Sequence, residues 1–443
     1  MPINPLVVQG RDARFADQRW LLDLVIELAG PDWDQGRLEY YAGPCSPDHK
    51  AAFLGLRGSI KKFDDFTREL VKVARHYELR GQGQIAAGHD RSAADDLFAA
   101  AIAYGAAQWP IYTNSELNLV LEQKKNGCYA AYAERADHPV TAVEVPYQGR
   151  TVPGYLHLPS GVTPGDPEAR LPLVVMVSGM DAFKELAVCA SADRYLERGL
   201  AVLVLDGPGQ GSCLPREIWY DPATYGELGT TAYETATARP EIDPDRIMVW
   251  GLSQGSFWAT QLAAAEPRYA ACSVMYTCFD PQNTAMFAMQ SPTFRQKFMF
   301  MTGATSVEEL QQKVAAMEVG PLSAKLTMPY LVIAGEDDPL TDLQQTLDHL
   351  NHVPDPKVLL LYTGEEHAPM TRSSGQLGPA VMVYPADWLA DRAAGKPVES
   401  QKIVVDSLGQ QHIEPWGDAQ HYSYGAPLDA KTLFGDGTAT GTA

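Results

Sequence analysis

The chain has 443 residues, 45% of them hydrophobic, and its 35 basic and 55 acidic side chains give a formal net charge of −20. This length predicts two or three structural units and ample material for a buried core. The acidic balance argues against nucleic acid and anionic membrane surfaces as partners, because both are bound by basic surfaces.

The cysteines and the N-terminus bear on the cellular compartment. The cysteines at 45, 128, 189, 213, 272 and 278 show no C-x-x-C spacing and no accompanying histidine cluster. We therefore expect no metal site and no disulfide framework, but free thiols in a reducing compartment. The N-terminus has no basic segment followed by an apolar one, and no apolar run reaches about 18 residues. These features predict a cytoplasmic protein without a signal peptide or membrane span.

Residues 1–138 form the first unit, which we expect to be a helical N-terminal cap domain. Helices are predicted at residues 20–28, 60–77, 91–108 and 115–135. In the second of these, apolar residues at 63, 66, 70, 71, 73 and 74 follow the period of an amphipathic helix. Gly30 and Pro31 are a typical helix stop after the first.

The composition changes near His138 and Pro139, where strand patterns begin. Residues 142–158 read as a hairpin around Gln148 and Gly149. Apolar strands are then predicted at 173–177, 201–205, 247–250, 272–276, 330–334 and 358–362, and helices at 186–198, 222–238 and 257–265. Apolar strands that alternate with helices predict an α/β fold with a doubly wound, mostly parallel sheet across residues 139–395.

Residues 278–327 interrupt this alternation, because they separate two strands by about fifty residues. The segment contains Met286, Phe287 and Phe298. We interpret it as a helical insertion or lid whose apolar side chains contact substrate, with ordinary core packing as the alternative. Residues 396–443 form a C-terminal extension, and we expect about its last ten residues to be disordered.

The strongest chemical signal is Gly251-Leu252-Ser253-Gln254-Gly255, which stands between a predicted strand and an alanine-rich helix. G-x-S-x-G in this context predicts a nucleophile elbow, in which the serine occupies a strained turn at the carboxyl edge of the sheet. Glycines on both sides allow the strand and helix to approach closely. The alternative is a glycine-rich turn that serves packing only.

A catalytic serine needs a base and an acid that orients the base, and in this sheet type the order is serine, acid, histidine. His367 follows the strand at 358–362 and is the predicted base. The strand at 330–334 ends in Glu336, Asp337 and Asp338. We favour Asp338 as the acid, with Asp337 as the alternative and Glu336 as a weaker candidate.

The oxyanion that forms during acyl transfer needs backbone N–H donors. The Gln254 amide, next to the serine, and the Met180 amide, after the strand at 173–177, are the predicted donors. The run 206–212 resembles a phosphate-binding G-x-G-x-x-G loop, but Pro208 and the lack of a suitable acidic residue about 20 positions on argue against a dinucleotide. We interpret it as a tight loop at the same sheet edge. Residues 243–247 read as a turn that leads into the serine strand.

These motifs together resemble the α/β-hydrolase superfamily across residues 142–395. A narrower resemblance rests on residues 87–93, 99–104 and 178–185, which are similar to the group containing 2,6-dihydroxypseudooxynicotine hydrolase and the fungal heptaketide-shortening hydrolases of pigment biosynthesis. It implies a helical N-terminal cap, a homodimer, and cleavage of a carbon–carbon bond next to a ketone. The chain departs from the group at Ala99 and Ala100, where an arginine is expected, and in the extension after residue 395.

The sequence thus predicts a serine-dependent hydrolase that cleaves a C–C bond in a β-diketone or acyl-aromatic substrate without a metal or organic cofactor. The partner is then a small apolar or aromatic ketone or ester. Hydrolysis of an ester or lactone, or acyl transfer, by the same residues is an alternative. A catalytically silent binding protein is the alternative from another class.

Overall fold

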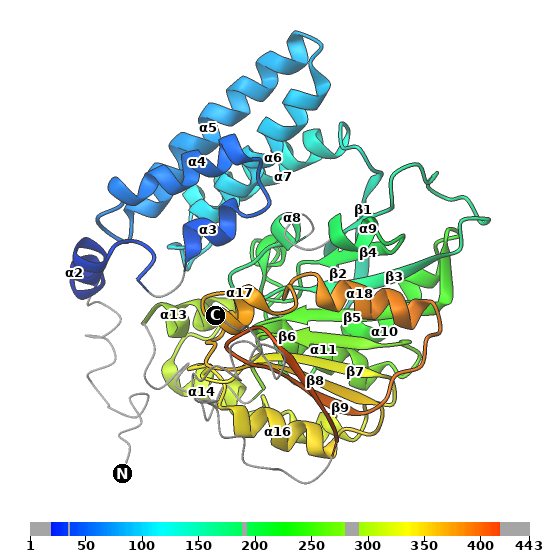
Figure 1. Cartoon of the computed structure of the whole chain (residues 1–443). Coiled ribbons are helices and arrows are strands. Elements are labelled where there is room, and N and C mark those ends of the chain that lie inside the picture. The colour runs from blue at the N-terminus through cyan, green and yellow to red at the C-terminus, as the bar shows by residue number, and fades with distance from the viewer. Residues whose placement is uncertain (1–18, 34–35, 188–192, 280–291, 417–443) are drawn as a thin grey trace, which may run out of the picture.

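The computed structural model describes residues 19–33, 36–187, 193–279 and 292–416. Helices from the N-terminal third gather on one side of a twisted sheet, and further helices cover the sheet itself (Figure 1). The expected α/β fold with a doubly wound, mostly parallel sheet and a helical N-terminal region is confirmed. None of the described helices is both long and apolar enough to cross a lipid bilayer.

The N-terminal region consists of helices that pack through small residues. They are α2 (Arg19–Ala29), α3 (Arg37–Ala42), α4 (Pro47–Gly55), the 3-10 turn η2 (Leu56–Gly58), α5 (Asp65–Ala86), α6 (Asp90–Ala107) and α7 (Glu116–Ala133). A Cβ on Gly81 of α5 would lie 2.9 Å from Leu97 of α6, so the glycine sets their spacing. Ser115 caps α7 by accepting a hydrogen bond from the Asn118 amide.

The described strands form one ten-stranded sheet in the order β1-β2-β4-β3-β5-β6-β7-β8-β9-β10. The strands are β1 (Val140–Tyr147), β2 (Arg150–His157), β3 (Leu171–Val177), β4 (Ala201–Leu205), β5 (Ile242–Leu252), β6 (Cys272–Met275), β7 (Tyr330–Gly335), β8 (Lys357–Tyr362), β9 (Gln401–Val405) and β10 (Gln411–Pro415). Pairing is parallel from β4 to β9 and antiparallel for β1–β2, β2–β4 and β9–β10. The carboxyl ends of the central strands therefore meet at one edge.

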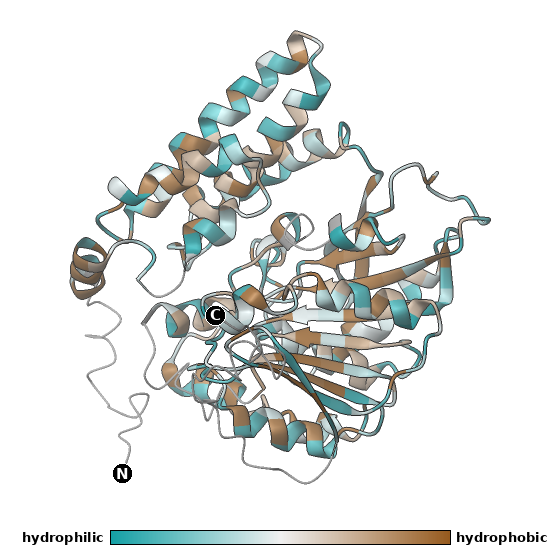
Figure 2. Ribbon diagram, in the orientation of Figure 1, coloured by the Kyte–Doolittle hydropathy of each residue, from teal (hydrophilic) through white to brown (hydrophobic). Residues whose placement is uncertain are grey.

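The remaining helices belong to the sheet domain, in which α10 and α11 pack on one face of the sheet and α18 on the other. They are α8 (Lys184–Ala187), α9 (Asp193–Leu196), the 3-10 turn η4 (Gly211–Cys213), α10 (Glu227–Thr237), α11 (Gln254–Ala265), α13 (Pro292–Thr302), α14 (Val307–Ala315), α15 (Gly320–Ser323), α16 (Leu343–His352), α17 (Ser373–Leu377) and α18 (Tyr384–Ala393). Figure 2 shows hydrophobic residues along the central strands.

The two faces of the sheet build two different hydrophobic clusters. Val174 and Met176 of β3 belong to a cluster that continues into the N-terminal helices and includes Phe66 and Ala101. Their neighbours on the same strand, Leu173, Val175 and Val177, belong to the other cluster together with Trp258 of α11. The N-terminal helices thus share a continuous core with one face of the sheet, and they pack against the central strands through it.

Three expectations about local structure need correction. Residues 243–247 are not a turn but part of β5, where the pairing with β3 shifts register between Leu171 and Leu173. Asp243 stabilises this irregularity through ion pairs with Arg170 and Arg246. In place of the single helix expected at 186–198, the structure has two short helices, α8 and α9. Residues 188–192, between them, lie outside the described part of the chain. The C-terminal extension contains two unforeseen strands, β9 and β10.

The buried His349 of α16 predicts a loss of stability in mild acid. Its ring contacts Phe279, and its Nδ1 lies 2.8 Å from the Ser323 hydroxyl. Burial, and then the nearby His352, lower the pKa of His349 to about 3. An unfolded histidine titrates near pH 6.5, so the stabilising effect of the neutral buried ring is complete above that pH and declines as the pH falls toward 3.

Between pH 7 and pH 5 we expect this residue to reduce the free energy of unfolding by about 2 kcal/mol. Urea unfolding of the wild type and of His349→Gln at both pH values measures the effect. The decrease between the two pH values should be smaller in the variant by that amount. Equal decreases in the two proteins would contradict the assignment of a neutral buried ring.

Candidate active site

Ser253 lies in a strained turn between β5 and α11. Its φ is 58° and its ψ is −127°, a region that side-chain-bearing residues rarely adopt. A Cβ on Gly251 would lie 2.0 Å from the Gly255 carbonyl oxygen, and one on Gly255 would lie 2.4 Å from the Val177 carbonyl oxygen. No side chain fits at either glycine, so the close packing of strand and helix requires both. The expected strand–turn–helix geometry is present.

The structure brings Ser253, His367 and Asp338 together, although they are distant in sequence. Ser253 Oγ lies 2.9 Å from His367 Nε2, and His367 Nδ1 lies 2.8 Å from Asp338 Oδ2. The Asp338 side chain is 1% exposed, and its Oδ1 accepts a hydrogen bond from the Leu340 amide. Asp338 therefore holds the imidazole with one oxygen while the other is fixed by its own loop.

The geometry distinguishes among the three candidate acids. Asp337 is exposed to solvent, whereas Glu336 Oε2 accepts a hydrogen bond from the Gly364 amide. Burial raises the pKa of Glu336. Among these residues, Asp338 is the one whose carboxylate bonds to His367.

Glu365 is a supporting residue that sequence reasoning missed. Its carboxylate is fully buried and accepts hydrogen bonds from the Thr371 amide and hydroxyl and from the Arg372 and Gly375 amides. These bonds close the loop that carries His367. The pair Glu365 and Glu366 was visible in the sequence, but nothing local shows which of two adjacent glutamates turns inward.

The two expected oxyanion donors lie beside the serine. Gln254 is the first residue of α11, where an amide has no partner within the helix. A Cβ on Gly179 would lie 3.0 Å from Ser253 Cβ, so the loop that contains Met180 abuts the nucleophile. Among the described turns and caps, neither the Met180 nor the Gln254 amide donates to another group. Both amides therefore stand available near Ser253.

Gln210 orients the loop that contains Met180. Its buried side-chain amide donates to the carbonyl oxygens of Ser178 and Gly179, at 3.2 and 2.8 Å. The Gly179 carbonyl and the Met180 N–H belong to one trans peptide and point in opposite directions. By holding that carbonyl, Gln210 fixes the direction of the Met180 N–H. The run 206–212 is thus a tight loop at the sheet edge, as expected.

A buried ionic network lies behind the same loop. Asp206 accepts hydrogen bonds from the Lys184 amide and the Ser212 amide and forms an ion pair of 3.0 Å with Lys184 Nζ. Glu185 lies between Lys184 and Lys125 of α7, at 2.6 and 3.1 Å. Burial opposes ionisation of Asp206, but Lys184 and Lys125 hold its pKa below the usual range. The network joins α7 of the N-terminal region to the oxyanion loop.

Helix α3 contacts the loop that contains Met180. Arg37 forms an ion pair of 2.7 Å with Asp181, next to Met180, and its guanidinium lies 3.9 Å from the centre of the Trp109 ring. The Tyr41 hydroxyl donates to the Asp181 carbonyl oxygen. Sequence reasoning predicted neither α3 nor these contacts.

Of the three residues expected to contact substrate, the structure describes one. Met286 and Phe287 lie outside the described residues. Phe298 of α13 is fully buried and packs against Tyr220 within the core cluster of the second sheet face. Its contact with substrate stays a prediction.

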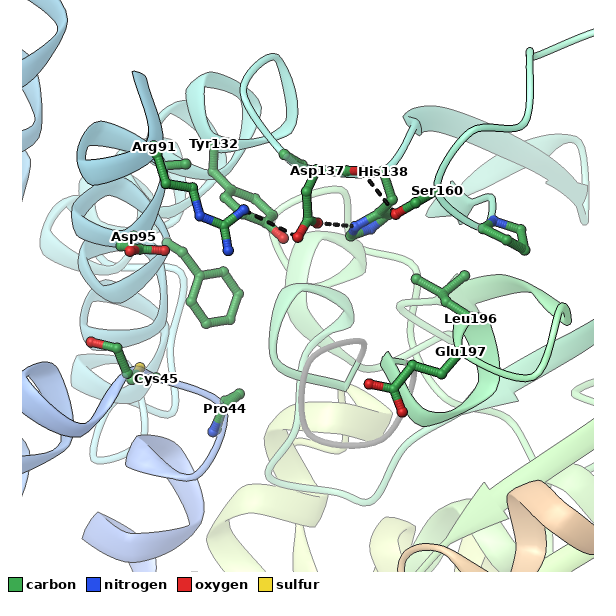
Figure 3. Close-up of a pocket in the computed structure, with 15 residues that line it drawn as sticks. Pro44, Cys45, Arg91, Asp95, Tyr132, Asp137, His138, Ser160, Leu196 and Glu197 are labelled. Atoms are coloured by element: carbon green, nitrogen blue, oxygen red, sulfur yellow. Dashed lines mark hydrogen bonds and ion pairs between the residues drawn. The ribbon is translucent and has the colours of Figure 1, made fainter. Parts of the chain in front are cut away.

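A cavity lies away from Ser253, between the N-terminal helices and the start of the sheet domain (Figure 3). Its volume is about 590 Å³, and none of Ser253, His367 and Asp338 lines it. Asp137 at its rim is already paired with Arg91 and His138. We place the candidate active site at Ser253, because there a serine in a strained turn lies in hydrogen-bond contact with a histidine that a buried aspartate orients, at the carboxyl edge of the sheet.

Comparisons with known proteins relate the chain to hydrolases. Residues 69–296, just over half of the chain, match the model of the FrsA-like esterase family. A 2,6-dihydropseudooxynicotine hydrolase from Paenarthrobacter nicotinovorans is 27% identical over 337 residues, which cover 74% of this chain and 85% of the relative. An α/β-hydrolase, gkaG, from Penicillium citrinum is 33% identical over 50% of this chain and 53% of its own length.

A solved structure extends the similarity to most of the chain. The crystal structure of 2,6-dihydroxy-pseudo-oxynicotine hydrolase superposes with a TM-score of 0.69 at 26% identity. The match covers 82% of this chain and 97% of that protein. The similarity therefore includes the N-terminal helices as well as the sheet.

Replacement of Gln210 tests its orienting role. In Gln210→Leu we expect kcat for 4-nitrophenyl acetate to fall about 10- to 100-fold with little change in KM, somewhat less than the loss of a whole oxyanion donor. Gln261→Leu is the matched control, because Gln261 is also buried and donates to a backbone carbonyl, that of Pro222. The control should lose stability but keep its kcat. Equal kcat in the two variants would contradict the role of Gln210.

Proposed function

The chain belongs to the FrsA-like esterase family of α/β-hydrolases, and on that premise we propose that it is a serine hydrolase with Ser253, His367 and Asp338 as its catalytic triad. The observation that carries this proposal is the pair of contacts at His367, 2.9 Å to the serine and 2.8 Å to the aspartate. Because Asp338 accepts from Nδ1, Nε2 is left as the acceptor for the serine proton.

The first half of the reaction forms an acyl-enzyme. Ser253 Oγ attacks the substrate carbonyl carbon while His367 Nε2 takes the hydroxyl proton. The Met180 and Gln254 amides bind the oxyanion, and each such donor is typically worth about 10²–10³ in rate. When the tetrahedral intermediate collapses, the bond to the leaving group breaks and His367 returns the proton to that group. Water then attacks the acyl-serine with His367 as base, which releases the acid and restores the hydroxyl.

We propose that the leaving group is carbon, so that the enzyme cleaves the C–C bond next to a ketone in a β-diketone or acyl-aromatic compound. The similarity to the pseudooxynicotine hydrolases, which extends over the N-terminal helices, supports this choice. Aromatic side chains near the site, including Trp109, Tyr41 and Phe183, suit an apolar or aromatic substrate. The departing carbanion must be stabilised as an enolate or by ring hydroxyls.

Ester or lactone hydrolysis, or acyl transfer, is the second candidate function. The name of the matching family, an esterase family, favours ester hydrolysis. It needs the same residues but releases an alkoxide instead of a carbanion.

A homodimer and a cytoplasmic location remain predictions. Light scattering after gel filtration tests whether the protein is a homodimer.

Labelling with a fluorophosphonate tests the triad. The wild type should label, and Ser253→Ala should not, because only an activated serine reacts. Ser273→Ala is the matched control, since Ser273 is a fully buried serine on the neighbouring strand β6. In Asp338→Asn the labelling rate should fall by about 10³–10⁴, whereas Asp337→Asn should label almost like wild type. Labelling that survives in Ser253→Ala would refute the proposal.

Paired substrates distinguish carbon–carbon from ester cleavage. An acyl-phloroglucinol and a β-diketone are compared with 4-nitrophenyl esters by the release of carboxylic acid, in wild type and in Ser253→Ala. We expect the wild type to release acid from at least one ketone substrate, and the variant to release none. Turnover of esters alone would reject the C–C assignment and leave the triad standing.

A further inference from the structure

Tyr276, directly after β6, has a strained backbone. Its φ is 55°, in the left-handed region, where a bulky aromatic residue is an outlier. Its amide donates to the Ile333 carbonyl oxygen at 3.1 Å, so hydrogen bonding between β6 and β7 continues up to this residue. Such strain persists only where the surrounding structure imposes it, and it is concentrated at functional sites.

The strained turn decides which face of the sheet receives the Tyr276 side chain. Cys272 and Val274 of β6 belong to the hydrophobic cluster on one face, and Met275 belongs to the cluster on the other face. In a regular strand the next side chain would point back to the first face. Tyr276 instead lies in the same cluster as Met275, which continues into the N-terminal helices. The left-handed turn therefore keeps two successive side chains on one face.

The ring that is placed in this way packs against the proposed base. The ring centroids of Tyr276 and His367 are 5.9 Å apart, with an angle of 58° between the ring planes. Tyr276 is 6% exposed, and its hydroxyl donates to the Met382 sulfur at 3.5 Å. Sulfur is a weak acceptor, so this bond does little to offset the strain of the turn. The contact with His367 is the feature of this ring that bears on the site.

The contact matters because the imidazole changes its charge during the reaction. In the proposed mechanism, His367 becomes positively charged each time it takes a proton from Ser253 or from water. An aromatic ring whose centroid lies within about 6 Å of a cation attracts it through the ring quadrupole. Tyr276 is at such a distance, on β6, whereas Asp338 holds the imidazole from the loop after β7.

Tyr276 itself stays neutral while His367 titrates. Burial raises the pKa of Tyr276, and the nearby Tyr40, Tyr362 and Glu365 add to this shift. A change in pH dependence on replacement of this tyrosine therefore does not come from ionisation of its own hydroxyl. The titratable and charged groups around the two rings, which all variants below retain, include Asp338, Glu365, Glu366, Arg372, Tyr40 and Tyr362.

We propose that Tyr276 is a positioning residue for the base of the proposed serine hydrolase. Its ring keeps the imidazole against Ser253 and stabilises the positive charge that the imidazole carries during each proton transfer. The proton passes from the serine hydroxyl to His367 Nε2 and on to the leaving group, and Tyr276 neither gains nor loses one. This inference rests on the proposed function, to which it adds a residue that acts through His367.

Removal of the ring should change the rate and its pH dependence together. In Tyr276→Leu the imidazole becomes a weaker base, because its charged form loses the aromatic contact. For 4-nitrophenyl acetate we expect the plateau of kcat to fall about three- to tenfold and the acid limb of the kcat profile to move to lower pH by about half to one unit. KM should change little. Tyr276→Phe should retain the plateau and the limb, because it keeps the ring.

Tyr233→Leu is the matched control. Tyr233 of α10 is also 6% exposed and packs against another ring, that of Tyr269. The control should lose stability but keep the plateau and the acid limb, because a loosened fold does not alter the basicity of His367.

A second series keeps the shape of the ring. If Tyr276→Leu does not fold, phenylalanine analogues with one, two or three ring fluorines at position 276 replace it in the test. Fluorine withdraws electron density from the ring and so weakens its attraction for a cation. Each added fluorine should move the acid limb further toward lower pH, relative to Tyr276→Phe.

Fluorophosphonate labelling separates the outcomes for the two proposals. If the wild type labels, an unmoved acid limb in Tyr276→Leu or in the fluorinated series overturns the role of Tyr276 and leaves the hydrolase proposal intact. The same holds if Tyr276→Phe loses as much as Tyr276→Leu, because the hydroxyl would then be the important group. Failure of the wild type to label overturns the hydrolase proposal and the positioning role with it.

Discussion

The close packing of β3, β5 and α11 around Ser253 is the constraint on which the rest of the site depends. Gly251 and Gly255 leave no room for a Cβ, so the chain between them must turn sharply, and Ser253 takes up a positive φ. Such a backbone costs about 1–3 kcal/mol and persists only when the surrounding core imposes it. The turn places the hydroxyl at the edge where β7 and β8 also end, so Asp338 and His367 can reach it from their own loops.

The oxyanion loop is held from three directions by polar contacts that lie far apart in sequence. Gln210 fixes two of its carbonyl groups, Lys184 ties its end to Asp206, and Arg37 of α3 pairs with Asp181. Lys125 of α7 adds a buried ion pair with Glu185. Buried ion pairs contribute little net stability, but removal of one partner is costly. The N-terminal helices therefore act on the site through the position of this loop as well as by covering it.

Much of the fold could be predicted because its signals are local. Continuous apolar runs marked the central strands, and the glycines around Ser253 marked the turn. His367 and Asp338 followed because parallel strands end at one edge. Strands β9 and β10 escaped prediction: residues 411–415 are largely polar and exposed, and become a strand only by pairing with β9. Arg37, Gln210 and Glu365 were missed for a related reason, since the importance of a polar residue depends on neighbours that only the folded chain supplies.

The central claim is that Ser253 becomes acylated during turnover. Its most direct test is to quench the wild type with acid while it hydrolyses a 4-nitrophenyl ester, digest it with trypsin and measure peptide masses. Cleavage after Arg246 and Arg268 yields a peptide of residues 247–268 that contains Ser253. The account predicts that this peptide carries the mass of the acyl group on that serine. Continued turnover with the acyl group on another residue, or with no acylated peptide at any quench time, would contradict it.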